Sequence, residues 1–547
     1  MATNITYSVD QKTPDTKSTL ESKEIQSFDV QILMDRHEFS EDGRNIIETE
    51  KLLPKALLSR LHSNYPQHSG FKEAAEIMFT SAKKRYTGLA DFKEICRVLE
   101  KNGIMLGNIK ERELFIEVYR FLATKHVLNA IDWSNFQEDS VFQLVFPQPG
   151  MINEETVKDY SEAKDDVERK EIVEAYMEKT NPHDGKQMLN RPSYINEDGE
   201  SVVLKGCQHK YPHCLLLFDQ TTQSCFAYCN YCFRHAQVRG DEDMFLQKEV
   251  NQVHEYLKRH KEVTDVLITG GDGAFIPYER LNKYLTPIME DPDLIHIRTI
   301  RMASRALTYY PELVLSSKYN KTLDLYKKLS DSGIQVIWMG HFSTPKELLN
   351  ISTIAAIRRL RAKSVSIRSH SPAMNHISLF SDENGKVDID RSAQNWIDLG
   401  NVLMMLSISF HSIYCARPTG EHHYFTVPLA DMNKIFGKIY RSLPSIGRPS
   451  RYITMTSSAG KISLFGTVEI NGKKAFVLKF NEARNMEWVD RVFLAEYDEQ
   501  ENTIEKLKPF EANSYFYEAE LNRIEKDLEN YKKDDFEKLL MQNISHF

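Results

Sequence analysis

The 547-residue sequence lacks the features of membrane, secreted and nucleic-acid-binding proteins. No apolar run approaches the roughly eighteen residues that a membrane-spanning helix needs, and the most apolar stretch, Val402 to Phe410, has the length of a core segment. The N-terminus lacks the basic-then-apolar order of a signal peptide. A formal net charge of −8 argues against nucleic acid or an anionic membrane as the main partner. We therefore expect a protein that binds neither of them.

Cysteine is also scarce, with seven in the whole chain. An odd number without a regular framework argues against a secreted protein held together by disulfides, so we expect a cytoplasmic location. Hydrophobic residues make up 41% and charged residues 27%, which is the balance of a globular protein. The length predicts two or three structural units rather than one.

Three of the seven cysteines nevertheless lie within eight residues, as Cys225, Cys229 and Cys232 in the pattern C-x3-C-x2-C. Thiolates are soft ligands that select zinc, copper(I) or iron–sulfur clusters. Structural zinc normally closes with four protein ligands, whereas a 4Fe–4S cluster held by three cysteines keeps one iron free for a small molecule. Three interpretations remain open here: an iron–sulfur cluster, a zinc site completed by His235 or Cys214, or buried apolar cysteines.

The first part of the chain is polar and then helical. We expect residues 1–25 to be a disordered lead-in. Beyond residue 50, apolar residues recur at helical spacing and no chemistry is evident, so we expect a cap, an oligomer contact or a plain scaffold. The predicted helices are Lys51–Ser63, Phe71–Arg85, Asp91–Lys101, Lys110–Lys125 and Glu154–Lys179.

From about residue 200, short apolar strands alternate with amphipathic helices. This repetition argues for parallel β/α units with right-handed crossovers. About six such units would make a partial barrel, with functional groups at the C-terminal ends of the strands. The predicted strands are His213–Phe218, Asp265–Thr269, Ile297–Ala303, Ile334–Gly340, Ser364–Arg368 and Ser407–Tyr414.

Polar groups follow several of these strands. The glycines of Gly270-Gly271-Asp272 allow a ligand to approach the backbone, and the aspartate can accept hydrogen bonds from an ammonium group, although the motif alone also suits an ordinary turn. Ser304 and Arg305 could hold a carboxylate or a ribose, or Arg305 could be a surface arginine. His341 is a further candidate, with a structural role as the alternative.

After about residue 440 the pattern changes again. Lys461–Phe480 predicts a β-hairpin around Asn471-Gly472, a dipeptide that favours a type I′ turn. A strand over Trp488–Tyr497 and a mixed-charge helix over 512–542 follow. The predicted fold is therefore α/β: a lead-in at 1–25, a helical region at 26–200, a partial (β/α)6 barrel at 201–440 and a hairpin-and-helix region at 441–547.

The cysteine spacing, with an aromatic residue before the last cysteine and a Gly-Gly-Asp loop after the next strand, resembles the radical S-adenosylmethionine (SAM) enzymes. From about His209 to Gly466 the chain resembles lysine 2,3-aminomutase and its relatives. The resemblance implies a 4Fe–4S cluster on the three cysteines, with SAM on the open iron. It also implies a group of SAM-binding residues, namely Gly270, Gly271, Asp272, Ser304, Arg305 and His341.

In this family a pyridoxal phosphate (PLP) lysine follows a glycine-rich loop. Thr456-Ser-Ser-Ala-Gly460-Lys461 fills that place, so the resemblance makes Lys461 the candidate Schiff-base residue, with a solvent-exposed lysine as the alternative. Three of the family's loop glycines are Ser457, Ser458 and Ala459 here. The basic pair that binds the phosphate is only partly matched, and Lys210 and His213 are the expected substitutes.

The substrate pocket departs from the family pattern. The arginine that grips the α-carboxylate is matched by Arg234. Two aspartates that hold the distal ammonium of lysine are replaced, by position, by Arg417 and Thr454. An arginine in place of an aspartate would repel lysine and attract a carboxylate, so we expect an acidic, glutamate-like substrate.

The resemblance implies an isomerase, a PLP-dependent 2,3-aminomutase that moves the α-amino group to the β-carbon by way of a 5′-deoxyadenosyl radical. It also implies a small amino acid substrate, a reductant such as flavodoxin or ferredoxin, and a homo-oligomer. Two alternatives stay open. One is a radical SAM enzyme of another reaction type without PLP, and the other is a zinc-stabilised binding protein that catalyses nothing.

Overall fold

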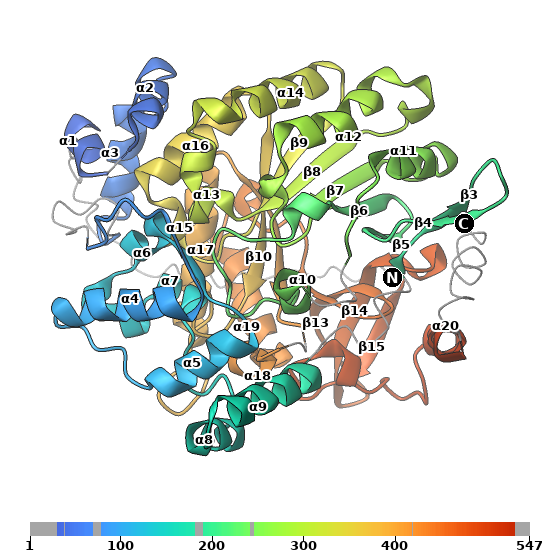
Figure 1. Cartoon of the computed structure of the whole chain (residues 1–547). Coiled ribbons are helices and arrows are strands. Elements are labelled where there is room, and N and C mark those ends of the chain that lie inside the picture. Colours follow the sequence, from blue (N-terminus) through green and yellow to red (C-terminus); the bar gives the residue numbers. More distant parts are fainter. Residues whose placement is uncertain are drawn as a thin grey trace, which may run out of the picture.

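The computed structural model describes residues 30–37, 39–68, 78–180, 190–240, 245–417 and 420–530, which form a mixed α/β fold around one large mixed sheet (Figure 1). The lead-in predicted at 1–25 lies outside these ranges. No helix within them is both long enough and apolar enough to cross a bilayer. The four-part division of the chain stays a prediction.

The large sheet has eleven strands in the described part of the chain, and their spatial order follows the sequence. From β6 to β12 neighbouring strands pair in parallel, whereas β5, β13, β14 and β15 pair antiparallel. The strands are β5 (Cys207–Tyr211), β6 (Cys214–Phe218), β7 (Asp265–Thr269), β8 (Thr299–Ser304), β9 (Gln335–Gly340), β10 (Ser366–Ala373), β11 (Ser409–Cys415), β12 (Ile453–Thr456), β13 (Gly460–Ile470), β14 (Lys473–Ala483) and β15 (Val492–Glu496).

Helices connect the parallel strands, which confirms the alternation predicted from the sequence. Figure 1 shows α11, α12 and α14 side by side along the sheet. Five of the six residues of β9 are buried, as expected for a parallel strand that is covered on both faces. The helices of this part are α10 (His235–Arg239), α11 (Val250–Arg259), α12 (Tyr278–Glu290), α13 (Ala306–Tyr309), α14 (Asn320–Asp331), α15 (Pro345–Leu348), α16 (Ile351–Ala362), α17 (Ile389–Met405), α18 (His422–Phe425) and α19 (Leu429–Ser442).

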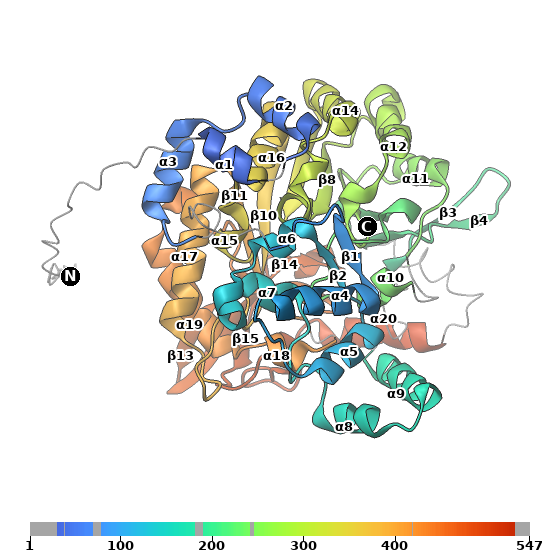
Figure 2. The same ribbon diagram turned by 60° about the vertical axis from the view of Figure 1, so that its left-hand side comes forward.

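The N-terminal region is mostly helical, with one small two-stranded sheet beside α4, α6 and α7 (Figure 2). A second small sheet precedes β5 and consists of β3 (Ser193–Ile195) and β4 (Ser201–Val203). The N-terminal elements are α1 (Val30–Arg36), α2 (Glu41–Thr49), α3 (Lys55–Asn64), β1 (Arg85–Thr87), α4 (Gly88–Lys101), α5 (Ile109–Val118), β2 (Leu122–Thr124), α6 (Lys125–Ala130), α7 (Ser140–Val145), α8 (Glu154–Glu162) and α9 (Asp166–Lys179).

Three helix predictions in this region are wrong in whole or in part. The helix predicted over Lys110–Lys125 ends at Val118, because Leu122–Thr124 is buried on both sides and pairs with β1. The helix predicted over Glu154–Lys179 is two helices, and the side chain of Asp165 caps the second by accepting from two backbone N–H groups. Residues 71–77 of the helix predicted over Phe71–Arg85 lie outside the described residues, and the rest of that prediction is wrong, because residues 78–84 form no helix and Arg85 is in β1.

The C-terminal hairpin is confirmed. β13 and β14 pair around Asn471 and Gly472, whose positive φ angles of 52° and 75° are those of a type I′ turn. The next strand begins later than predicted, at Val492. Of the helix predicted at 512–542, the structure describes α20 (Glu518–Asn530), and the rest lies outside the described residues.

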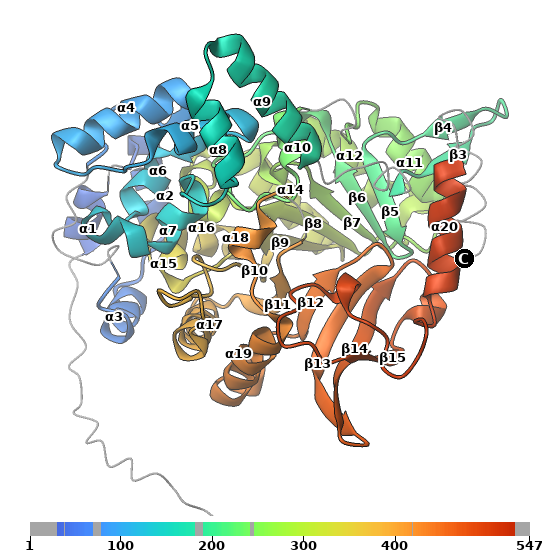
Figure 3. The same ribbon diagram turned by 90° about the horizontal axis from the view of Figure 1, so that it is seen from below.

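The two ends of the large sheet approach each other. β14 contacts β5, although the two strands lie nearly at opposite ends of the strand order. The Lys210 amine, from β5, donates to the Ser457 carbonyl after β12, at 2.6 Å. Figure 3 shows the strands following one another from β5 round to the β13–β15 hairpins. The sheet is therefore strongly curved, and residues far apart in sequence meet inside the curve.

Candidate active site

The cysteine loop follows β6 and is supported by the N-terminal region. The backbone N–H of Tyr228 donates to the Leu122 carbonyl of β2, and that of Asn230 donates to the Leu144 carbonyl of α7, both at 2.9 Å. The guanidinium of Arg85 donates to the Cys225 carbonyl at 2.6 Å. The N-terminal region is therefore more than a distant scaffold, because its strands β1 and β2 and its helix α7 supply the hydrogen-bond partners that fix this loop.

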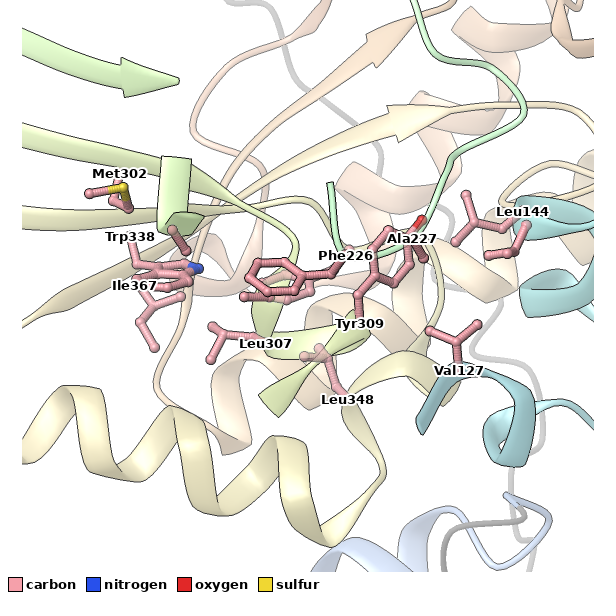
Figure 4. Close-up of a cluster of buried hydrophobic side chains, with 14 of the residues drawn as sticks. Val127, Leu144, Phe226, Ala227, Met302, Leu307, Tyr309, Trp338, Leu348 and Ile367 are labelled. Atoms are coloured by element: carbon pink, nitrogen blue, oxygen red, sulfur yellow. The ribbon is translucent and has the colours of Figure 1, made fainter. Parts of the chain in front are cut away.

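Apolar packing surrounds the same loop. Figure 4 shows Phe226 and Ala227 between side chains of the N-terminal region, including Val127, and side chains of the sheet, including Met302. The ring of Phe226 stacks on that of Phe275, with 4.2 Å between ring centroids. This packing keeps water away from one side of the cysteines.

The three thiols of the loop are free cysteines. Among the described residues, no group of three or more thiol, imidazole or carboxylate ligand atoms within 4.8 Å of one another includes them. The three sulfurs are thus not gathered as closely as the separation of about 3.8 Å that tetrahedral zinc bonds of about 2.3 Å would give. Burial raises the pKa of each thiol, and neighbouring thiolates raise the pKa of Cys225 and Cys232 further.

Cys214, one of the residues considered for a fourth zinc ligand, is not available to the loop. It opens β6, and the loop begins after the other end of that five-residue strand, which spans roughly 13 Å. Its sulfur instead accepts a hydrogen bond of 2.8 Å from Arg301. A closed zinc site that uses Cys214 therefore does not form.

The Gly-Gly-Asp loop after β7 packs directly on the cysteine loop. The backbone N–H groups of Gly271 and Asp272 donate to the Thr222 carbonyl, at 2.8 and 3.2 Å. A Cβ at Gly270 would lie 2.4 Å from that carbonyl oxygen, and one at Gly271 would lie 3.0 Å from the Cys225 sulfur. The sequence needs glycine at both positions because a side chain would push the two loops apart.

Asp272 forms hydrogen bonds that stabilise the end of the neighbouring strand, β8. Its carboxylate accepts from the backbone N–H groups of Ala274 and Arg305, both at 2.9 Å. Burial raises the pKa of Asp272 to about 6, against the lowering effect of these bonds and of the Ser304 hydroxyl. Each oxygen therefore has a protein donor and retains capacity for one more hydrogen bond.

Arg305 is buried, so the surface interpretation of this arginine is wrong. Its guanidinium forms an ion pair of 2.8 Å with Glu347 and donates to the Tyr231 hydroxyl at 2.8 Å. It also contacts the Tyr309 hydroxyl at 3.3 Å, and this hydroxyl lies 2.9 Å from the Cys229 sulfur. Most of its donors thus bind protein groups, and Arg305 orients two tyrosines beside the cysteine loop.

Replacing Glu347 by alanine is expected to lower the free energy of unfolding by about 3–5 kcal/mol, because it leaves the buried guanidinium of Arg305 without its counter-charge. Equilibrium denaturant unfolding would measure the loss. The matched control is Glu138→Ala, which removes an exposed ion pair with Arg391 and should cost less than about 1 kcal/mol. Equal losses in the two variants would contradict the importance of the buried pair.

A cavity of about 380 Å³ lies inside the curve of the sheet, next to the cysteine loop. Its lining combines residues of β5, the parallel strands and the C-terminal hairpin. Six of the residues singled out from the sequence line it, namely Lys210, Arg234, His341, Arg417, Thr454 and Lys461. The fold therefore brings the expected substrate and PLP residues into one space.

Lys461 lies in this cavity beside an acidic partner. Its amine is 2.5 Å from a carboxylate oxygen of Glu482 on β14 and 4.9 Å from the ring centroid of Tyr211. Burial lowers the pKa of Lys461, while Glu482 opposes that change. Burial also works against ionisation of Glu482, but Lys461 and Arg451 outweigh it and lower its pKa to about 2. The solvent-exposed alternative for Lys461 is therefore not what the structure shows.

Positive charge accumulates at one end of the cavity. Burial lowers the pKa of Lys210 well below its usual value, and the repulsion of Arg484, Arg417 and Lys461 adds to the effect. Arg484 donates to the Ser458 carbonyl at 2.8 Å. Such a cluster of cations beside a serine-rich loop fits the phosphate of PLP.

His213 does not belong to this cluster, and its expected role is wrong. It is exposed in the turn before β6, outside the cavity, and its ring contacts the Glu262 carbonyl at 3.0 Å.

The guanidinium groups of Arg234 and Arg417 both lie close to the aromatic ring of Phe233. Their guanidinium carbons lie 5.1 and 4.7 Å from the ring centroid of Phe233. Burial lowers the pKa of Arg234 to about 10, and the charge of Arg417 contributes to the lowering. Arg234 donates to the Thr269 hydroxyl at 2.5 Å, which ties it to the end of β7. Two cationic groups therefore face the same cavity.

Thr454 and His341 add polar but uncharged groups. The hydroxyl of Thr454 donates to the Tyr452 carbonyl at 2.8 Å and lies 2.9 Å from the Ser463 hydroxyl. Burial lowers the pKa of His341 to about 3, so this imidazole is neutral. The ring of His341 lies 5.6 Å from that of His370, which also lines the cavity.

Sequence reasoning missed several residues of the cavity. Glu482, Arg484 and His370 carry no recognisable spacing, and each gains its neighbours only when the sheet curves. The one local signal is that Glu482 and Arg484 flank Ala483, the buried residue that ends β14, so two charged side chains stand at this end of the strand.

No protein-family model matches the chain. It is 25% identical over 278 residues to a protein of Aquifex aeolicus named “Putative L-lysine 2,3-aminomutase”, a match that covers 50% of this chain and 68% of the relative. It is 30% identical over 155 residues to the L-lysine 2,3-aminomutase of Acetoanaerobium sticklandii, covering 28% and 34%. It is 26% identical over 204 residues to the glutamate 2,3-aminomutase of Clostridioides difficile, covering 35% and 45%.

Proposed function

We propose that this chain is an isomerase that moves an amino group from carbon 2 to carbon 3 of an acidic amino acid. Its relatives support a lysine 2,3-aminomutase-like family, as predicted from its motifs. The observation that carries the proposal is one cavity that joins two arginines, Arg234 and Arg417, to the Lys461–Glu482 pair beside the cysteine loop.

Members of this family use a 4Fe–4S cluster, SAM and PLP, and the residues present fit all three. The three cysteines would hold the cluster, the Gly-Gly-Asp loop would meet SAM, and the cations around Lys210 would hold the phosphate of PLP. When bound, the cluster and SAM supply radical chemistry and PLP supplies electron delocalisation at the substrate. A flavodoxin or ferredoxin would supply the electron, and the active form would be a homo-oligomer.

The chain's own residues position the substrate and exclude water. Arg234 binds the α-carboxylate, and Arg417 binds the distal carboxylate from across Phe233. Glu482 holds the amine of Lys461 in place, at the position where this lysine would hold PLP. The neutral His341 offers a hydrogen bond without adding charge. This is positioning catalysis, in which reacting groups are held in place in a dry cavity.

The curved sheet supports a partial barrel for this chemistry. The parallel strands β6 to β12 put their C-terminal ends on one side, where the cysteine loop and the Gly-Gly-Asp loop both lie. The contact of β14 with β5 brings the hairpin across the open edge. A barrel of this kind would gather the reacting groups at the strand ends.

Replacing Arg417 by alanine is expected to raise KM for glutamate by about 10- to 100-fold, because a charge-assisted hydrogen bond to a carboxylate contributes about 1.5–3 kcal/mol. Steady-state kinetics with glutamate and with lysine would measure the effect. Arg391→Ala removes an exposed arginine and serves as the control. Wild-type protein that prefers lysine over glutamate would contradict the acidic substrate.

The cofactors are tested on protein purified without oxygen. We expect about four irons and about one PLP per chain, with broad visible absorbance that dithionite bleaches. Iron without PLP would favour a radical SAM enzyme of another reaction type. Zinc alone would refute the enzyme and favour a zinc-stabilised binding protein.

A further inference from the structure

Glu421 is a buried carboxylate with an unusual pair of partners. The hydroxyls of Tyr119 and Tyr176 both donate to its Oε1 atom, each at 2.7 Å. Tyr119 follows α5 and Tyr176 lies in α9, some 302 and 245 residues earlier in the chain. Its side chain is only 2% exposed, so these hydroxyls replace water as the carboxylate's donors.

Glu421 stands directly before α18, which forms part of the cavity wall. His422 and Phe425 of α18 line the cavity, and Phe425 meets the ring of Tyr231 of the cysteine loop edge to face, with 6.0 Å between centroids. A further contact, from the Tyr424 hydroxyl to the Gln143 side chain at 3.2 Å, also runs to the N-terminal region. The N-terminal region, which lies outside the parallel strands, thus holds α18 in place.

Stability alone does not account for this arrangement. The imidazole of His423 lies 3.6 Å away and is 54% exposed, so the two tyrosine hydroxyls, at 2.7 Å, are the short donors to this carboxylate. Burial accordingly raises the pKa of Glu421 against the effect of those hydroxyls. An apolar contact of the same size would stabilise the fold at least as well. The two hydroxyls and the carboxylate, by contrast, form directed hydrogen bonds that fix one orientation of the Glu421 side chain.

We propose that Glu421, Tyr119 and Tyr176 form a positioning unit that holds α18 as a wall of the amino acid cavity. The expected change in KM rests on the proposed function. The expected change in the mobility of α18 rests on the geometry alone. The positioning unit gives the N-terminal region a task in substrate binding in addition to its support of the cysteine loop. None of the three residues lines the cavity itself.

The test is the double variant Tyr119→Phe/Tyr176→Phe, which keeps both rings and removes both hydroxyls. Hydrogen–deuterium exchange of residues 420–426 is expected to accelerate about tenfold, while β7 to β9 stay unchanged. KM for the amino acid is expected to rise about tenfold with kcat changed less than about twofold. In the otherwise wild-type chain, the single variant Glu421→Gln keeps an oxygen acceptor for both hydroxyls and is expected to retain most of the wild-type behaviour.

The matched control is Tyr160→Phe, which removes another buried hydroxyl of the N-terminal region, one that interacts with Glu117 rather than with α18. It should leave both exchange and KM as in the wild type. Unchanged exchange at 420–426 in the double variant would overturn the proposal. Accelerated exchange in a protein that isomerises no amino acid would retain the positioning unit and refute only the proposed function.

Discussion

Replacing Cys229 by alanine is expected to remove most of the bound iron and to lower activity by about a thousandfold, which corresponds to about 4 kcal/mol of lost transition-state stabilisation. A 4Fe–4S cluster with one open iron needs one cysteine sulfur for each of its other three irons. The two cysteines that remain in the variant therefore cannot retain the cluster. The tyrosine that lies beside Cys229, Tyr309, keeps its contact with Arg305, so the surrounding structure is expected to persist.

Iron and sulfide analysis, with the visible spectrum before and after dithionite, would check this result. Cys96→Ala is the control, because Cys96 is a free cysteine buried in α4 and lies outside the cysteine loop. It should retain full iron and activity. A Cys229 variant with an unchanged iron content would show that the loop does not hold a cluster.

Lys461→Ala has the second large effect. We expect the variant to lose covalently bound PLP and about a thousandfold in activity, because no other described lysine of the cavity lies beside a carboxylate that could orient it. Stability should change little, since Arg451 remains 2.9 Å from Glu482 and keeps that carboxylate paired. Iron content should also be unchanged, which separates this variant from the cysteine variant.

PLP absorbance and content would measure the loss. Lys473→Ala, at an exposed position of the same hairpin, is the matched control and should retain the cofactor. If the Lys461 variant kept full activity, the lysine would have no part in the reaction, and a radical SAM reaction without PLP would become the better interpretation.

The sequence predicted six of the seven described strands that pair in parallel, β6 to β11, and missed β12; the reason for the six is local. A strand such as β9 is buried on both faces, so its apolar run is visible without knowledge of its neighbours. β2 was missed because its three residues continue the apolar spacing of the helix before them, and only pairing with β1 makes them a strand. Burial against a partner overrode the local preference there.

The site was predicted in part for the same reason. The cysteines and Gly270-Gly271-Asp272 form compact motifs, so short stretches of sequence reveal them. Arg305 was expected to bind a ligand, and its ion pair with Glu347 depends on a residue 42 positions away that no motif marks. Glu421 depends on partners 302 and 245 positions away, and no reading of local sequence could have joined them.

The hydrogen bonds from the cysteine loop to β2 and α7 also bear on the order in which the protein is made. A chain leaves the ribosome N-terminus first, and its parts fold as they emerge. The loop therefore appears when its acceptors, Leu122 and Leu144, have already been synthesised. Ser457, by contrast, must meet Lys210, which was made 247 residues earlier. The two halves of the site thus mature at different times during synthesis, with the half that carries the cysteines first.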